Sequence, residues 1–305
     1  MSFKFLVLMM QTKRQIQQLL ASAGIRPNKR LGQNFLIDLN LMKLLIDSAQ
    51  IRNDDIVLEV GCGTGSLTQG LAEKAAKVIA VELDKPLAEI AERQLAKKKN
   101  VEIINADILK NKNTVSPAVI NALEQAHKKH AGRLLLVANL PYNVASPVML
   151  NLITGTVTAD DMYVTVQKEV ADRMTANPGS KNYGTLSIFL SATGDVKTIR
   201  RLKPTVFWPA PQVDSAMITF VRRKKKAARI KNTELFRKIV NLFIGHRRKM
   251  LKTCTKLAAG KLKEINNWSE ILEKCSIDPH NRPEQIPHED YIAIANLCCK
   301  YLKPS

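Results

Sequence analysis

Short apolar runs alternate with longer stretches of mixed apolar and polar positions over the first half of the chain. The runs have the length of buried strands and cover residues 56–60, 78–81, 101–104, 134–138 and 162–166. Between several of them the apolar positions recur at helical spacing, as over residues 87–97 and 147–153. Strands that alternate with helices in this way predict a mostly parallel sheet with helices on both faces.

The segments before the first predicted strand and after the last one differ from this pattern. Helices are predicted over residues 12–23 and 39–49, and the segment between them is basic and irregular. Further along, a short helix over residues 186–191 leads to two strands, 196–202 and 213–221. These two strands are expected to close the sheet as a hairpin-type pair.

The run of basic residues from 222 to 231 is the natural domain boundary. Beyond it the pattern is purely helical, with helices expected over residues 234–244, 247–257, 268–274 and 288–302. We therefore predict two domains. Residues 1–223 form an α/β domain, of which residues 1–33 are an N-terminal extension and basic arm, and residues 224–305 form a small, basic, all-α domain.

Composition is typical of a globular protein with a sizeable core. The 305 residues are 45% hydrophobic, and no apolar run reaches the length of about 18 residues that a membrane span needs. Residues 3–10 resemble the apolar part of a signal peptide, but the basic and glutamine-rich residues after them break that order. We expect a short extension there, or a true start at Met9 or Met10.

The cysteines and histidines indicate a reducing compartment and no metal site. The five cysteines have no disulfide or metal-ligand spacing, and the five histidines are scattered along the chain. Reduced thiols are the rule in the cytosol. We therefore expect a cytoplasmic protein without a bound metal.

Charge is strongly positive and unevenly distributed. The chain has 47 basic and 27 acidic residues, a net charge of +20, and residues 222–263 contain 16 lysines and arginines against the single acid Glu234. Such clustering favours a polyanionic partner such as a nucleic acid. A solubilising surface is the alternative, and binding to a membrane surface is a weaker one because the only amphipathic stretch there is short.

A glycine-rich loop after the first predicted strand indicates a nucleotide-like cofactor. It reads Glu59-Val60-Gly61-Cys62-Gly63-Thr64-Gly65, and glycines at a strand-to-helix turn let the backbone approach a ligand closely. Glu82 lies 21 residues beyond Gly61 at the end of the second strand, where an acid can accept both ribose hydroxyls. Enzymes that use nicotinamide and enzymes that use S-adenosylmethionine share this pairing.

Two details favour S-adenosylmethionine. The spacing of the loop is Gly-x-Gly-x-Gly after an acid, and a further acid, Asp107, follows the third strand, where it can accept from the adenine amine. For Asp107 alone, a helix N-cap is the alternative. Together these strand ends predict a Rossmann-like, S-adenosylmethionine-dependent methyltransferase domain.

The fourth strand ends in Asn139-Leu140-Pro141-Tyr142, which fits methylation of an exocyclic adenine amine. The Asn139 carboxamide oxygen and a backbone carbonyl can accept the two N–H bonds of that amine and aim its lone pair at the methyl carbon. Pro141 fixes the turn. Tyr142 offers a ring face to an extruded base, an interaction of roughly 1–3 kcal/mol. Because a sulfonium is a good leaving group, positioning and electrostatics suffice for catalysis.

The sequence resembles the ribosomal RNA adenine dimethyltransferase family, in its small-subunit branch that confers kasugamycin sensitivity in bacteria. The resemblance runs over nearly the whole chain from about Thr12, and it rests on the glycine loop, the Asn139 tetrapeptide and several other motifs. These motifs are residues 29–36, Val81-Glu82-Leu83-Asp84, the extension of the tetrapeptide to 139–147, residues 166–173, 183–187, 207–216 and 247–251, and Arg282-Pro283-Glu284.

The resemblance implies N6,N6-dimethylation of two adjacent adenosines in a hairpin loop near the 3′ end of small-subunit rRNA, with a role in ribosome biogenesis. The partner it implies is an immature 30S-type subunit, bound by a monomer. The cofactor-binding positions that carry over are Asn34, Leu36, Gly61, Glu82, Asp107 and Asn139. One departure is Ala210, because the family usually has three consecutive prolines at 209–211.

Contacts with RNA are expected from one aromatic residue and from the basic segments. Phe207 is the candidate for the second wall of the base pocket, with packing of the closing strands as the alternative. Arg222, Arg223, Arg247 and Arg248 are expected to contact phosphates, which position RNA but do not read its sequence. Loop bases are already unstacked, which lowers the cost of extruding one.

Two other functions remain open at this point. One is the related large-subunit methyltransferase of the macrolide-resistance type, which would lack the Val213-Asp214-Ser215 and Arg282-Pro283-Glu284 pattern. The other is a ribosome-assembly factor that binds immature subunits and for which methylation is secondary.

Overall fold

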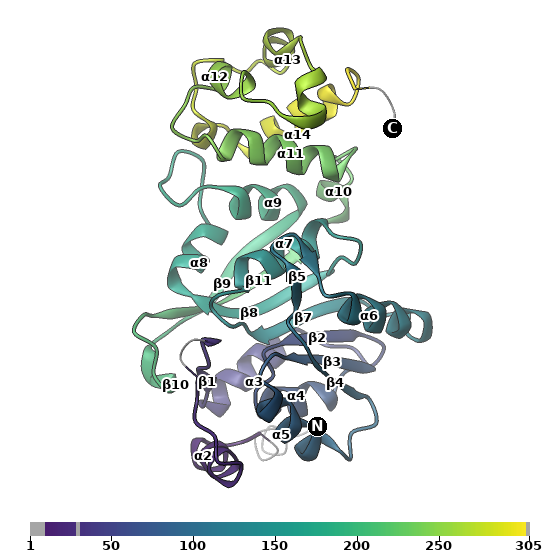
Figure 1. The fold of residues 1–305 in the computed structure, drawn as a ribbon, viewed down its shortest axis with the longest axis vertical. Helices are drawn as coiled ribbons and strands as arrows, with labels where there is room; N and C mark the ends of the chain where they lie inside the picture. The colour runs from purple at the N-terminus through teal and green to yellow at the C-terminus, as the bar shows by residue number, and fades with distance from the viewer. Residues whose placement is uncertain (1–9, 29–30, 303–305) are drawn as a thin grey trace. The chain divides into compact units, whose positions relative to one another are not determined.

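The structure is a computed structural model that describes residues 10–28 and 31–302, and it divides into two compact units (Figure 1). The first unit comprises Met1–Ala171 and Lys197–Val221, and the second comprises Asp172–Val196 and Arg222–Ser305. The chain passes from the first unit to the second for the last time between Val221 and Arg222, two residues before the expected boundary at 223/224. That residues 172–196 group with the C-terminal helices was not expected from the sequence.

A seven-stranded sheet organises the first unit, in the order β4-β3-β2-β7-β8-β11-β9. Strands β2, β3, β4, β7 and β8 run parallel, as predicted, and β11 runs antiparallel to β8 with Ser215 opposite Gln167. The strands are β2 (Ile56–Val60), β3 (Lys77–Glu82), β4 (Val101–Asn105), β7 (Leu134–Asn139), β8 (Asp161–Gln167), β9 (Gly194–Leu202) and β11 (Ser215–Arg222).

The order of the strands creates a crevice at the carboxyl edge of the sheet. The chain leaves β2 toward β3 and β4 on one side and later returns to β7 on the other side of β2. At such a reversal the loops after neighbouring strands diverge, and ligands of open α/β sheets bind between them. The loops after β2, β3, β4 and β7 are those that carry the predicted cofactor and catalytic residues.

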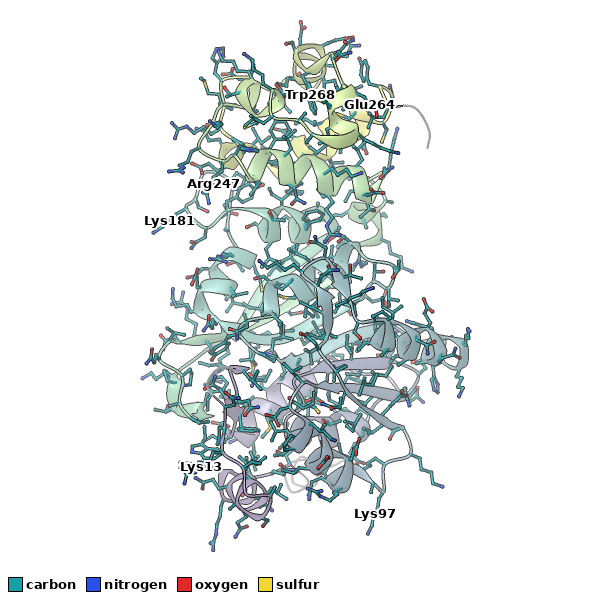
Figure 2. The ribbon with its side chains drawn as sticks, in the orientation of Figure 1. Lys13, Lys97, Lys181, Arg247, Glu264 and Trp268 are labelled. Atoms are coloured by element: carbon teal, nitrogen blue, oxygen red, sulfur yellow. The ribbon has the colours of Figure 1, made fainter. Side chains whose placement is uncertain are left out.

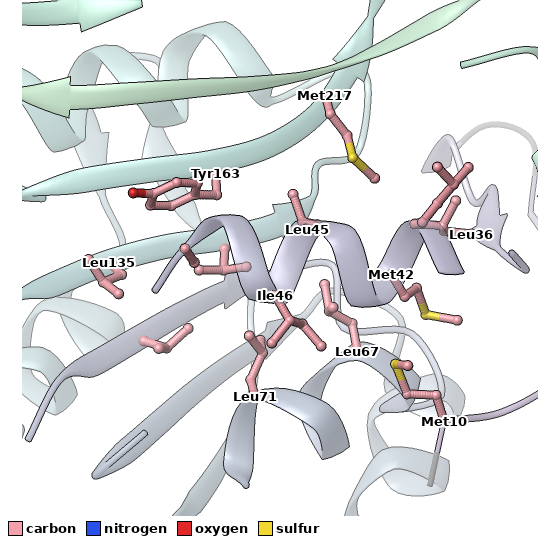
Figure 3. Packing of buried hydrophobic residues seen from close by; sticks show 14 of the residues in the cluster. Met10, Leu36, Met42, Leu45, Ile46, Leu67, Leu71, Leu135, Tyr163 and Met217 are labelled. Carbon is pink, nitrogen blue, oxygen red and sulfur yellow. The ribbon is translucent and has the colours of Figure 1, made fainter. Parts of the chain in front are cut away.

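Helices cover both faces of this sheet. On one face, α3 packs against β8 and α4 against β3, and Leu45 and Ile46 of α3 lie between Tyr163 on the sheet side and Leu71 on α4 (Figure 3). Leu58 is fully buried on the opposite face, because side chains alternate along a strand. The helices are α2 (Lys13–Ser22), α3 (Leu39–Ser48), α4 (Ser66–Ala72), α5 (Lys85–Leu95), α6 (Pro117–Lys129), α7 (Ala145–Thr154) and α8 (Lys168–Met174).

Local sequence explains where several helices begin. Thr12 caps α2 in a capping box with Gln15, Asp38 caps α3, and Asp84 caps α5 with a proline in its first turn. Two short two-stranded sheets were not predicted. One pairs β1 (Phe35–Leu36) with β10 (Phe207–Trp208), and the other pairs β5 (Leu109–Asn111) with β6 (Thr114–Val115).

The second unit is helical around an aromatic core. Phe189 of α9 meets Phe236 of α11 edge to face at 5.0 Å, and Phe243 of α11 meets both Trp268 and Tyr291 at 6.2 Å. These contacts explain why residues 172–196 join this unit. Its elements are α9 (Thr185–Thr193), α10 (Lys224–Ala227), α11 (Thr233–Ile244), α12 (Leu251–Thr255), α13 (Trp268–Lys274), α14 (His288–Cys298) and two short 3₁₀ turns.

Two predicted helices of the second unit are shorter than expected, and the one expected over 288–302 ends at Cys298. The helix expected over 247–257 begins only at Leu251, because hydrogen-bonded turns follow Ile244 and Met250 has an extended backbone. The expectations for residues 3–10 and for Lys29 and Arg30 fall wholly or largely outside the described residues. Within the described part of the chain, no helix is long and apolar enough to cross a membrane.

Candidate cofactor and catalytic site

A cavity of about 160 Å³ lies in the first unit at the carboxyl edge of the sheet. Its wall includes the segments after β2, β3, β4 and β7, together with residues 31–36 and Ile16 of α2. The structure thus brings seven of the predicted site residues to one cavity. They are Asn34, Leu36, Gly61, Gly63, Glu82, Asp107 and Asn139, and Leu140, Pro141 and Tyr142 of the tetrapeptide line it as well.

The glycine loop is shaped by backbone that other residues rarely adopt. Gly61 and Gly63 have φ of +77° and +58°, a region that costs other L-residues about 1–2 kcal/mol. A Cβ on Gly61 would lie 2.7 Å from Cγ of Pro141, and one on Gly63 would lie 2.9 Å from Phe35. Gly61 therefore allows the glycine loop and the tetrapeptide at 139–142 to approach each other closely.

Glu82 at the end of β3 is held by backbone donors. Its Oε2 accepts from the amide of Gly63 at 2.8 Å and its Oε1 from the amide of Asp84 at 3.0 Å. Each carboxylate oxygen has two lone pairs, so both can accept a further bond from a ribose hydroxyl. Burial raises the pKa of Glu82, the two backbone bonds oppose that rise, and the charge of Asp84 adds to it.

Asp107 lies two residues beyond β4 and is exposed. Its Oδ1 accepts from the amide of Leu109 at 2.9 Å in a local turn, and Oδ2 makes no hydrogen bond to any described residue. The alternative role for Asp107 was an N-cap. Asp107 does accept a bond from the backbone two residues on, but the element that follows is a short strand, β5, and not a helix. Its Oδ2 can still accept from a ligand amine.

Asn139, the last residue of β7, has one amide atom bonded and one without a partner. Its Nδ2 donates to the carbonyl oxygen of Asn34 at 2.8 Å, whereas its Oδ1 is buried and has no partner among the described residues. A buried acceptor left unpaired costs about 1–3 kcal/mol. The side chain therefore presents an acceptor oxygen that a ligand N–H can satisfy.

The tetrapeptide supplies a second acceptor. The carbonyl oxygen of Pro141 already accepts from Val144, but the carbonyl oxygen of Leu140 accepts from none of the described residues. The amide of Leu140 donates to Thr165 on β8, which fixes the peptide. Asn139 Oδ1 and Leu140 O are thus two acceptors at one strand end, as capture of an –NH₂ group requires.

Tyr142 is half-buried, and its hydroxyl lies 3.0 Å from the hydroxyl of Ser215 on β11. Burial raises the pKa of Tyr142, and the bond to Ser215 opposes that rise. The phenol is therefore neutral at physiological pH, and its ring is held at the cavity wall by a second strand. The role of Ser215 was not predicted, because no local pattern links residues 73 positions apart.

Residues 33–36 are fastened to the site at both ends. Gln33 donates to Asp84 at 3.0 Å, and Phe35 stacks on Trp208 at 6.1 Å where β1 pairs with β10. These contacts place Asn34 and Leu36 at the cavity, a placement that only the family resemblance had implied.

Gln11 is a further contact that the sequence did not reveal. It is buried, its Nε2 donates to the carbonyl of Thr64, its Oε1 accepts from the Thr64 hydroxyl at 2.6 Å, and its amide donates to Ser66. The segment before α2 thus supports the end of the glycine loop.

Phe207 lies away from the cavity. It is 3% exposed, belongs to the core cluster that includes Leu36 and Met217, and does not line the cavity. Its position fits the packing alternative. The aromatic residues that line the described part of the cavity are Phe35 and Tyr142.

The predicted phosphate-binding arginines differ in their surroundings. Arg247 binds Glu284 at 2.7 Å and the carbonyl of Lys181, which lies next to it (Figure 2). Arg223 binds Asp195 at 2.6 Å, Arg222 is half-buried, and Arg248 is exposed. Arg247 therefore links parts of the second unit through its own hydrogen bonds. The side chain of Arg248 is exposed to solvent and is the more accessible of the two.

Comparison with known proteins identifies the family. The family model for ribosomal RNA adenine dimethylase matches residues 24–298. The chain belongs to this family. The enzyme class and the S-adenosylmethionine cofactor expected from the glycine loop and the strand ends are thereby confirmed.

Curated relatives match over most of both chains. A protein of Alkaliphilus oremlandii named ribosomal RNA small subunit methyltransferase A is 38% identical over 277 residues, 90% of this chain and 93% of that one. A Geobacillus protein of the same name is 35% identical over 288 residues, 93% of this chain and 96% of that one.

Solved structures share the fold. A dimethyladenosine transferase from Plasmodium falciparum superposes with a TM-score of 0.70 at 24% identity, over 87% of this chain and 97% of that one. The 23S rRNA methyltransferase ErmE gives 0.58 at 21% identity, over 86% and 98%. The Rossmann-like methyltransferase fold predicted from the sequence is confirmed.

Proposed function

We propose that this chain transfers methyl groups from S-adenosylmethionine to the N6 atoms of two adjacent adenosines in a hairpin loop near the 3′ end of small-subunit rRNA. Each adenosine receives two methyl groups. Relatives that carry the small-subunit name support the choice of RNA. The proposed setting is the cytoplasm, where a monomer binds an immature 30S-type subunit during ribosome biogenesis.

The unpaired Oδ1 of Asn139 is the observation that carries the chemistry. An adenine N6 amine has two N–H bonds and a lone pair that is delocalised into the ring. When Asn139 Oδ1 and Leu140 O accept both N–H bonds, the nitrogen moves toward tetrahedral geometry and its lone pair is freed for attack. This gain appears mainly in the transition state, where it accelerates the reaction.

The remaining residues hold the reactants. Glu82 is proposed to bind the ribose of the cofactor and Asp107 its adenine amine, while Gly61 and Gly63 let the backbone approach it. When bound, the cofactor supplies an electrophilic methyl group on a sulfonium. Tyr142, fixed by Ser215, provides the ring face on which the extruded base stacks.

On the RNA side, we propose that exposed cations of the second unit contact phosphates. Lys224, Lys225 and Arg248 are exposed, whereas Arg223 and Lys226 are both bound to Asp195. Lys224, Lys225 and Arg248 form no ion pair with a described residue, so they can bind phosphate without breaking one.

Two alternatives to this proposal remain. In one the modified RNA is that of the large subunit, and in the other the protein acts by binding and methylation is secondary. A large-subunit methyltransferase would share this fold, since ErmE superposes on it. The small-subunit name of the curated relatives favours small-subunit rRNA as the substrate. An assembly factor would use the same surface and need no turnover.

A labelling experiment tests the proposal. The protein is incubated with methyl-labelled S-adenosylmethionine and with unmethylated small or large subunits, and the labelled nucleotides are mapped. We expect label on two adjacent adenosines of small-subunit rRNA. Label on large-subunit rRNA would support the first alternative, and an Asn139→Ala protein that restores subunit assembly without methylation would support the second.

A further inference from the structure

The cavity is acidic although the protein is strongly basic. Its described lining includes three carboxylates, Glu59, Glu82 and Asp107, and contains no lysine, arginine or histidine. In a chain of net charge +20, such a lining creates a local field that favours a cation. The roles proposed above use Glu82 and Asp107 as acceptors of neutral N–H and O–H groups and leave Glu59 without a role.

Glu59 lies on β2 inside the sheet and lines the cavity. It is 2% exposed, and its Oε2 is buried with no hydrogen-bond partner in the described part of the chain. Neighbouring Glu82 differs, since both of its oxygens accept backbone bonds. A buried carboxyl with an oxygen that no donor reaches favours its protonated form, because ionisation there would leave a poorly solvated charge.

The groups around Glu59 offer no cation to stabilise its charge. The titratable neighbours are Glu82 on β3 and the Cys62 thiol in the glycine loop, while β7 and α4 contain no titratable residue. Burial raises the pKa of Glu59 to about 8, the polarity of the nearby Thr68 hydroxyl opposes this, and the charge of Glu82 adds to it. The carboxyl is therefore mostly neutral below about pH 7 in the unliganded protein.

We infer that Glu59 is a specificity-determining residue that favours the cationic cofactor over the neutral thioether left after methyl transfer. When the sulfonium-bearing cofactor binds in the acidic cavity, Glu59 releases its proton to solvent and becomes the counter-charge. Once the methyl group has left, the sulfonium charge is gone, and Glu59 takes up a proton from solvent. The inference rests on the proposed function, since it assumes that S-adenosylmethionine binds in this cavity.

The consequence is a cofactor site that binds the product less tightly than the reactant. Four methyl transfers for each rRNA require the product to leave four times, so weaker product binding favours turnover. By linkage, the affinity for the cofactor rises with pH up to about the pKa of the unliganded carboxyl, whereas the affinity for the thioether stays flat.

Proton-linked calorimetry on the full chain tests this inference. S-adenosylmethionine and S-adenosylhomocysteine are titrated at pH 6.5 in buffers of different ionisation enthalpy. We expect release of about one proton with the first ligand and of about none with the second. Between pH 6.0 and 7.5, below the usual pKa of an α-amino group, about 7.7–8.0, the ratio of the two affinities should rise about 20–30-fold.

Two variants identify the group responsible. Glu59→Gln keeps the shape but cannot ionise, so proton release and the pH dependence of the affinity ratio should both vanish while S-adenosylhomocysteine still binds. Glu102→Gln is the matched control, because Glu102 is a half-exposed acid of the same sheet that pairs with Lys77. It should behave as the wild type.

The outcomes separate this inference from the proposed function. Equal proton release with both ligands, or an unchanged linkage in Glu59→Gln, would overturn the role of Glu59 and leave the methyltransferase assignment intact. If Glu59→Gln does not fold, the proton counts of the wild type still decide the matter. Failure of the wild type to bind either ligand would overturn both.

Discussion

The side-chain nitrogen of Asn139 donates a 2.8 Å hydrogen bond to the main-chain oxygen of Asn34. These two residues are 105 positions apart, and their contact ties the end of β7 to the segment that leads into β1. The bond also fixes the orientation of the amide, so that Oδ1 of Asn139 is the atom left buried and unpaired. The same contact thus orders the segment around Asn34 and orients the oxygen that we propose as the catalytic acceptor.

Glu82→Ala should weaken binding of S-adenosylmethionine by about 1.5–3 kcal/mol, the usual value of hydrogen bonds to a charged group. The variant also removes the acceptor for the Gly63 amide, so the glycine loop loses one support. Isothermal titration calorimetry measures the change directly. An affinity equal to that of the wild type would remove Glu82 from the cofactor site.

Gly61→Ala should reduce both stability and turnover, because its Cβ would lie 2.7 Å from Pro141 and push the tetrapeptide out of place. Gly24→Ala is the matched control: Gly24 also has positive φ, +67°, but nothing lies within 4 Å of its Cβ position. The control should lose about 1–2 kcal/mol of stability and keep its activity. Equal losses of activity in the two variants would mean that the approach of Gly61 to Pro141 does not matter for catalysis.

Replacing Lys224 and Lys225 together by alanine should weaken RNA binding and flatten its salt dependence, since fewer counterions are released. Both side chains are exposed, and neither is held by Asp195. Lys97→Ala with Lys99→Ala removes the same charge from exposed positions of the first unit, one of which is labelled in Figure 2. Filter binding over a salt series should show a change for the first pair only, and cofactor affinity should be unchanged for both.

Much of the fold could be predicted because the central strands are buried on both faces. Strands such as β2 and β7 then read as continuous apolar runs, which stand out against the amphipathic helices between them. The strand ends that carry Glu82 and Asn139 could be placed together as well, because parallel strands share one carboxyl edge.

Contacts between distant segments left no local signal. Gln11 with Thr64 and Tyr142 with Ser215 join positions 53 and 73 residues apart, and neither pair forms a pattern that periodicity detects. The count of basic residues likewise did not distinguish Arg247, which is bound to Glu284, from exposed Arg248. Phe207 was ambiguous for the same reason, since an aromatic residue between the two closing strands suits a core and a base pocket equally.

Single-turnover methylation by Asn139→Ala is the most direct test of the catalytic account. With cofactor and unmethylated small subunits both saturating, N6,N6-dimethyladenosine is quantified by mass spectrometry against time. Loss of one preorganised contact commonly lowers the rate about 10²–10³-fold, and we expect a loss of that size with a smaller change in cofactor affinity, arising from the lost bond to Asn34. A folded Asn139→Ala protein that forms dimethyladenosine at nearly the wild-type rate would contradict the role of the Asn139 oxygen in activating the adenine amine.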